Sequence, residues 1–206
     1  MRSVAYASKL LTKLSHTAVL STAVWCLCTG CGDNLAGPDA AIDAERIDAA
    51  PCPIATSGYG ALAFASTRAG RIHDGAGKET VAWLGALQAG PMSDVLDIQL
   101  LEGHGVFASG PPRTGMFALN GAESQLATCG TCVVLQVSAP RQYLVVQSGT
   151  LTIAELGPTG SGRFVGSLTH ATLARVTIDP VTNESRLLHD GCRTSITSAS
   201  WDTPIN

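Results

Sequence analysis

The stretch Asp94-Val95-Leu96-Asp97-Ile98-Gln99-Leu100-Leu101 decides the fold class. From Leu96 to Leu100 every second residue is apolar, and the residues between them, Asp97 and Gln99, are polar. This period of two places the apolar side chains on one face of an extended chain, whereas a helix would need them three or four positions apart. The stretch therefore predicts a β-strand with one face in a core.

Similar segments recur after Cys52, rich in Val, Ile, Leu and Thr and separated by turn residues such as Asp-Gly at 74–75. Residues 71–75 are predicted to be a turn. No long amphipathic helix is evident, so we expect an all-β fold: a single antiparallel β-sandwich or jelly-roll-like domain of about ten short strands. The expected strands are 59–65, 80–87, 94–101, 116–119, 132–138, 142–147, 149–156, 163–178 (long or broken at His170), 185–188 and 192–201.

Composition indicates a globular chain of low charge, with 45% hydrophobic residues, 14% charged residues and 22 glycines. Three of the thirteen Lys and Arg residues precede Cys31, so the other ten face sixteen acids and give a net charge of −6 after processing. Nucleic-acid-binding proteins carry a basic surface instead. We therefore expect no nucleic-acid partner.

The N-terminus has the three parts of a secretory signal. Basic residues at 2, 9 and 13 precede a twelve-residue, largely apolar run at 17–28, and the small residues Thr29 and Gly30 then lead into Cys31. The apolar run is shorter than the roughly 20 residues of a membrane-spanning helix. We expect residues 1–30 to be a signal peptide that is removed on export.

The Cys31 site resembles the lipobox of bacterial lipoproteins, in which small residues precede a cysteine that is acylated and becomes the new N-terminus. Thr29 and Gly30 fit this pattern, whereas Cys28 stands where Leu is usual. The resemblance implies lipidation of Cys31 and an anchor in the bacterial cell envelope; the alternative is an ordinary cleaved signal. Gly32 is not the Asp that retains lipoproteins at the inner membrane in some bacteria, which favours the outer membrane.

Residues 32–51 have the composition of a flexible acidic tether. The dipeptide Asp-Ala recurs at 39–40, 43–44 and 48–49, and five acids against one arginine give a charge of −4. Such a segment has too little apolar surface to form a core. We therefore assign 31–51 to the lipidated cysteine with its tether, and 52–206 to the folded domain.

Four cysteines remain in the domain: Cys52, Cys129, Cys132 and Cys192. An even number in an oxidising compartment predicts disulfides, and four cysteines allow three connectivities. The spacing favours Cys129–Cys132 as a local bridge and Cys52–Cys192 as a long one. The Cys-x-x-Cys motif has a redox alternative, but in thioredoxin-like enzymes this motif opens a helix, whereas Val133 to Val137 has the pattern of a strand.

Several segments of the domain are similar to a group of uncharacterised, Asp/Ala-tethered bacterial lipoproteins whose β-sandwich domain carries a CxxC motif. The similarity covers residues 90–201 and is most specific in the cysteine spacing. It implies the architecture and the location but no activity, because the group has none assigned. The segments are Gly-Met-Phe-Ala-Leu-Asn-Gly-Ala-Glu at 115–123, Ala-Thr-Cys-Gly-Thr-Cys-Val at 127–133, Gly-Thr-Leu-Thr-Ile at 149–153, Gly-Ser-Leu-Thr-His-Ala-Thr-Leu at 166–173, Val-Thr-Ile-Asp-Pro at 176–180 and Asp-Gly-Cys at 190–192.

The triplet His-Asp-Gly occurs twice, at 73–75 and at 189–191. Two histidines and two carboxylates would suit a metal or acid–base site if the fold brought them together, but Asp-Gly is also typical of a tight turn, which we favour. Nucleophile-elbow and phosphate-loop motifs are missing from the sequence. A sugar-stacking face is a further hypothesis, although the residues concerned are more typical of a core or an edge: Tyr59, Trp83, Tyr143 and Trp201.

The sequence thus predicts a lipid-anchored envelope protein with a disulfide-linked β domain, no enzyme, no metal and no cofactor. Its expected role is non-catalytic, either structural or binding an envelope protein or a glycan. The alternative is an enzyme, either a CxxC thiol–disulfide oxidoreductase or a hydrolase with a metal at the His-Asp-Gly turns.

Overall fold

The computed structural model describes residues 52, 54, 57–90 and 93–206. The predicted signal peptide 1–30, Cys31 and the tether 32–51 lie outside the described residues. Within the described part, no helix is long and apolar enough to cross a membrane. Two short 3-10 helices, η1 (Gly105–Phe107) and η2 (Gly121–Ser124), accompany ten strands. The strands are β1 (Ala61–Leu62), β2 (Ser66–His73), β3 (Glu79–Ala86), β4 (Val95–Leu101), β5 (Gly115–Ala118), β6 (Thr131–Ser138), β7 (Arg141–Leu156), β8 (Arg163–Ile178), β9 (Ser185–Leu187) and β10 (Arg193–Pro204).

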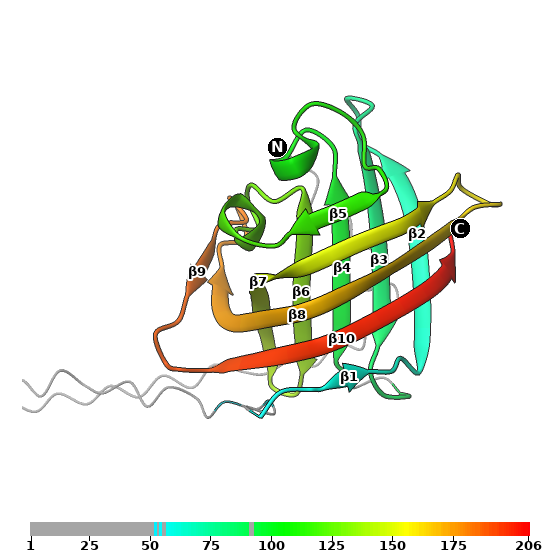
Figure 1. Cartoon of the computed structure of the whole chain (residues 1–206). Helices are drawn as coiled ribbons and strands as arrows, with labels where there is room; N and C mark the ends of the chain where they lie inside the picture. Colours follow the sequence, from blue (N-terminus) through cyan, green and yellow to red (C-terminus); the bar gives the residue numbers. More distant parts are fainter. Residues whose placement is uncertain (1–51, 53, 55–56, 91–92) are drawn as a thin grey trace, which may run out of the picture. The chain divides into compact units, whose positions relative to one another are not determined.

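The ten strands form one sheet in the order β1-β10-β8-β7-β6-β4-β3-β2, with β5 added to β7 and β9 added to β8. The pairing is antiparallel except that β1 runs parallel to β10. The sheet curls so that β2 approaches the end of β10, where Ala69 forms a parallel bridge with Ile205. In Figure 1, strands β2, β3, β4 and β6 form a layer behind β7, β8 and β10, which cross it. The fold is therefore a half-barrel.

The core fills the inside of this curl. Alternate residues of β3 and β4 face inward, as the period of two predicts, and Trp83, Leu96, Ile98 and Leu100 are fully buried. The Trp83 ring of β3 lies 4.7 Å from the Trp201 ring of β10, measured between centroids. This contact joins the two layers across the core.

The all-β prediction is confirmed, but the prediction of an antiparallel sandwich or jelly roll is not. A sandwich has two separate sheets, whereas β7 and β8, of 16 residues each, continue from one layer into the other. The β7–β8 ladder shifts register between Val146 and Ser148, between Ser148 and Thr150 and between Ile153 and Glu155, and these irregularities bend the pair. The inward alternation is the same for one curled sheet and for two flat ones, so the sequence pattern could not separate them.

Several strand boundaries also differ from the predictions. Of the expected strand 59–65, only Ala61–Leu62 is a strand, β1, and the next strand, β2, begins at Ser66. Residues 71–73 belong to β2, and the turn begins at Asp74. The expected strands 142–147 and 149–156 are a single strand, β7. His170 was expected to be partly buried or to mark a break; it is exposed, with a left-handed φ of 50°, and β8 continues through it.

Candidate functional site

The long disulfide joins Cys52, near the start of the folded domain, to Cys192, immediately before β10. The two Cα atoms are 5.3 Å apart and the residues are 140 positions apart in the chain. The pairing is the one that the spacing favours. It fixes the beginning of the domain to the start of its last strand.

The Cys129–Cys132 motif is also a disulfide, and both residues are buried, with 0% and 4% of their surface exposed. Cys132 is the second residue of strand β6 rather than part of a helix. A thiol that takes part in exchange needs access to its partner and a lowered pKa, usually from a helix N-terminus or a nearby cation. The local geometry therefore suits a structural bridge.

The buried carboxylate of Glu123 holds this motif in place, and the sequence analysis missed it. Its Oε2 accepts hydrogen bonds from the backbone N–H (2.5 Å) and the hydroxyl (2.7 Å) of Thr131, inside the CxxC motif. Its Oε1 accepts the N–H of Val106 in η1 at 2.9 Å. Glu123 thus ties η1, η2 and the start of β6 together.

The two His-Asp-Gly triplets form turns whose Asp side chains accept hydrogen bonds from the backbone. Asp74 accepts the N–H groups of Lys78 (2.9 Å) and Ala76 (2.8 Å), and the bond from Lys78 is the main reason that the pKa of Asp74 is lowered. Asp190 accepts the N–H of Cys192 at 2.8 Å. The described residues contain no group of three or more His, Cys, Asp or Glu that could hold a metal ion.

Asp190 also forms a buried ion pair with Arg175, whose Nε donates to Oδ2 at 2.6 Å. The two side chains are only 6% and 7% exposed. Burial alone would raise the pKa of Asp190, but the hydrogen bonds from Cys192 and Arg175 and the guanidinium charge outweigh it and lower that pKa. The second triplet therefore anchors the polypeptide beside the long disulfide.

Asp97 on β4 is a second buried carboxyl group. Its Oδ2 accepts the side-chain amides of Gln99 (3.0 Å) and Gln136 (3.1 Å), and its Oδ1 has no hydrogen-bond partner among the described residues. Burial raises the pKa of Asp97 to about 6. Perturbed carboxyl groups often mark functional sites, but the partners of Asp97 are two neutral amides rather than a nucleophile or a second acid.

The four aromatic residues do not form a common sugar-stacking face. Trp83 and Trp201 are buried, at 0% and 5% exposure, and stack on each other in the core. Tyr59 and Tyr143 are half-buried, and they lie on different segments: Tyr59 precedes β1, and Tyr143 lies in β7. The core interpretation therefore holds for both tryptophans.

A surface pocket of about 350 Å³ lies between η2 and β9, over β7 and β8. Its apolar lining comes from Val176 of β8 and Leu187 of β9. Polar side chains supply the rest: Ser124, Gln125, Gln147, Ser185, Arg186 and His189. The sequence analysis missed this site, because its residues come from separate segments and no local motif connects them.

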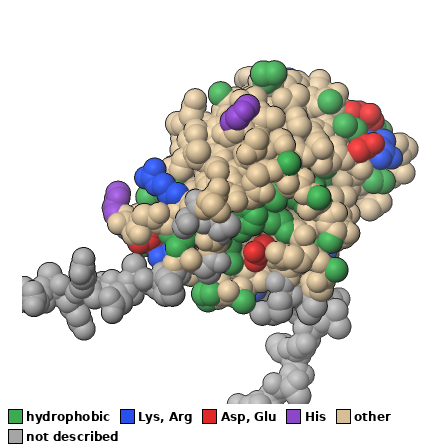
Figure 2. Space-filling model, turned by 60° about the horizontal axis from the view of Figure 1, so that its bottom comes forward, with side chains coloured by type: hydrophobic (Ala, Val, Ile, Leu, Met, Phe, Trp, Pro, Cys, Tyr) green, Lys and Arg blue, Asp and Glu red, His purple; other side chains and the backbone are tan. Residues whose placement is uncertain are grey.

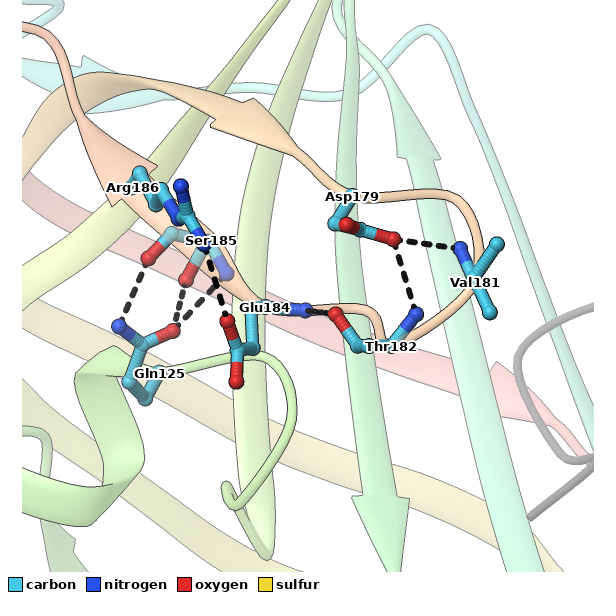
Figure 3. A network of polar contacts seen from close by, with 7 residues as sticks. All are labelled: Gln125, Asp179, Val181, Thr182, Glu184, Ser185 and Arg186. Carbon is cyan, nitrogen blue, oxygen red and sulfur yellow. Dashed lines mark hydrogen bonds and ion pairs between the residues drawn. The ribbon is translucent and has the colours of Figure 1, made fainter.

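Two residues join the sides of this pocket, here called the β9 pocket (Figure 3). The amide of Gln125 donates to the carbonyl of Ser185 (2.7 Å) and accepts the N–H (3.0 Å) and hydroxyl (2.5 Å) of the same residue. The three bonds between Gln125 and Ser185 hold β9 against the loop after η2. The turn that precedes β9 is ordered by Asp179, whose Oδ1 accepts the N–H groups of Val181 (2.8 Å) and Thr182 (3.0 Å).

The face in Figure 2 carries a few scattered charged side chains rather than a basic patch. No protein-family model, no curated protein and no solved structure matches the chain. The β9 pocket is thus the candidate site.

Proposed function

We propose that this protein is a lipid-anchored component of the bacterial cell envelope, held in the outer membrane by a lipid on Cys31. The acidic tether would present the β domain, which binds an envelope protein or a glycan without catalysing a reaction. The similarity to Asp/Ala-tethered lipoproteins with a CxxC-bearing β-sandwich domain is part of this proposal. Nucleic acid is not an expected partner of a chain with this acidic balance.

The Cys52–Cys192 disulfide is the observation that carries the proposal. Disulfides persist in oxidising compartments, which supports export. Cys52 also directly follows the tether in the sequence. A force on the lipid anchor would therefore be transmitted through this disulfide to the last strand.

The choice of binding over catalysis rests on how the candidate catalytic groups are used. The CxxC cysteines are buried in a disulfide, and Asp74 and Asp190 are occupied by backbone hydrogen bonds. Function still has to be argued from sites rather than from the fold, and the β9 pocket is a concave site with polar groups and an apolar wall. The alternative remains an enzyme, either a CxxC oxidoreductase or a metal-dependent hydrolase.

The test compares the mature protein with its Cys129→Ala/Cys132→Ala variant. Both are applied to an array of defined glycans and to purified envelope proteins, and both are assayed for disulfide reduction and isomerisation. The proposal predicts saturable binding that the variant retains, and no turnover by either form. Turnover that the variant loses, without binding by either form, would favour the oxidoreductase alternative.

A further inference from the structure

We propose that the β9 pocket binds a carboxylate-bearing sugar, such as a uronic acid unit of an envelope glycan, with Arg186 holding the carboxylate. This inference rests on the proposed binding function and names the class of ligand. Three features of the pocket support it: the charge of Arg186, the polar and apolar side chains of the lining, and the hydrogen bonds that order the pocket.

Arg186 is positioned to receive an acid from outside the protein. Its guanidinium nitrogen lies 3.6 Å from the Oε2 of Glu184, and the two side chains are 76% and 53% exposed. Exposed ion pairs contribute little to stability, so Arg186 can exchange Glu184 for a ligand carboxylate at small cost. A guanidinium group matches a carboxylate through two parallel N–H···O bonds.

The remaining walls suit the rest of a sugar ring. Gln147, Ser124 and His189 line the pocket with an amide, a hydroxyl and an imidazole, which can exchange hydrogen bonds with sugar hydroxyls. His189 makes no hydrogen bond or ion pair within the described part of the chain, so its ring nitrogens are available to a ligand. The side chain of Leu187, 41% exposed, offers apolar surface for the C–H face of the ring, whereas Val176, 6% exposed, adds little.

The charge of the pocket favours one carboxylate over a phosphate. Arg186 is the one arginine in its lining, and Arg175 on the neighbouring β8 is committed to Asp190. A phosphate monoester carries a charge of about −1.5 to −2 near pH 7, which exceeds the single positive charge of Arg186. A carboxylate carries one negative charge, which Arg186 matches once its weak pair with Glu184 is exchanged for the ligand.

The pocket is also ordered before a ligand arrives. The three bonds between Gln125 and Ser185 fix the start of β9 to the loop after η2, and Asp179 orders the turn that leads into it. A preformed site loses less conformational entropy on binding. The volume of about 350 Å³ lies at the small end of the range for ligand pockets, which suits one or two sugar units.

The experiment titrates the mature protein, by isothermal titration calorimetry at low salt, with a galacturonic acid trisaccharide and with neutral maltotriose. The variant is Arg186→Gln. The matched control is Arg163→Gln, which removes the same charge from another exposed arginine in an ion pair, with Asp202, at the opposite end of β8. Both arginines are exposed, so neither change should unfold the domain.

We expect the acidic trisaccharide to bind the protein and its Arg163→Gln form equally, and to bind Arg186→Gln about tenfold or more weakly, as for a lost hydrogen bond to a charged group. Maltotriose should bind at least about tenfold more weakly than the acidic sugar by the same reasoning. Equal binding of both sugars, an unchanged affinity in Arg186→Gln, or no binding of the acidic sugar would overturn the inference. If the acidic sugar does not bind, binding of another glycan on the array would leave the proposed function standing. An array without any bound glycan, together with no binding of an envelope protein, would contradict both the inference and the proposed function.

Discussion

Removal of the Cys52–Cys192 disulfide should destabilise the domain far more than removal of Cys129–Cys132. The long bridge spans 140 positions and the short one spans 3. In the chain-entropy model, a bridge stabilises by restricting the unfolded chain, which gives about 5 kcal/mol for the long bridge and about 2 kcal/mol for the short one. For a domain of this size, 1 kcal/mol corresponds to about 2–4 °C. We therefore expect the melting temperature to fall by about 10–20 °C in Cys52→Ala/Cys192→Ala and by about 4–8 °C in Cys129→Ala/Cys132→Ala.

The assay is calorimetric or circular-dichroism melting of both double variants, combined with urea unfolding to check that the transition stays two-state. Cys52 is half-buried, whereas the other three cysteines are buried, with 2% of Cys192, 0% of Cys129 and 4% of Cys132 exposed. Greater burial of the short bridge therefore works against the predicted order. Equal losses in the two variants, or a larger loss from the short bridge, would refute the argument from loop length.

Two further predictions concern buried charges. Arg175→Met should cost about 3–5 kcal/mol of unfolding free energy, because it leaves the buried carboxylate of Asp190 without its partner, whereas Arg163→Met in an exposed pair should cost far less; similar losses in denaturant melts would contradict this. Asp97→Asn should stabilise the domain by about 2–3 kcal/mol at pH 7.5 and by almost nothing at pH 4. The sign follows because the pKa of Asp97 is raised to about 6 when folded, so its stability contribution is present in acid and is lost as the pH rises through that value. An effect of Asp97→Asn that does not change with pH would show that the carboxyl group is not desolvated.

The sequence predicted the strands well where a regular alternation marks them. Leu96, Ile98 and Leu100 lie in the core as expected. Strand β2 was missed, because Ser66 to His73 has no such alternation, and its place in the sheet comes from its pairing with β3. A local pattern cannot report hydrogen bonds to another strand.

The curl of the sheet was beyond a local prediction for a similar reason. Gly149 has a φ of 144°, and a Cβ atom there would lie 2.8 Å from the Cα of Ala171. The sequence shows a glycine between two strand-like segments, and a break between strands was the simpler interpretation. Only the close approach of β8 shows that the glycine permits one long strand to bend.

The candidate site was predicted least well. Disulfide pairing could be inferred from spacing, because a tight local bridge leaves only one partner for each remaining cysteine. The β9 pocket depends on Gln125 meeting Ser185, which is 60 positions away. Neither residue belongs to a motif, so the site could be found only in three dimensions.

Mass spectrometry of the mature N-terminal peptide, taken from the membrane fraction of the native bacterium, will show whether this protein is lipid-anchored. We expect the chain to begin at Cys31 and to carry the added mass of acyl chains, and we expect Cys31→Ser to abolish both the processing and the lipid. A mature N-terminus at another residue, or an unmodified Cys31, would contradict this expectation.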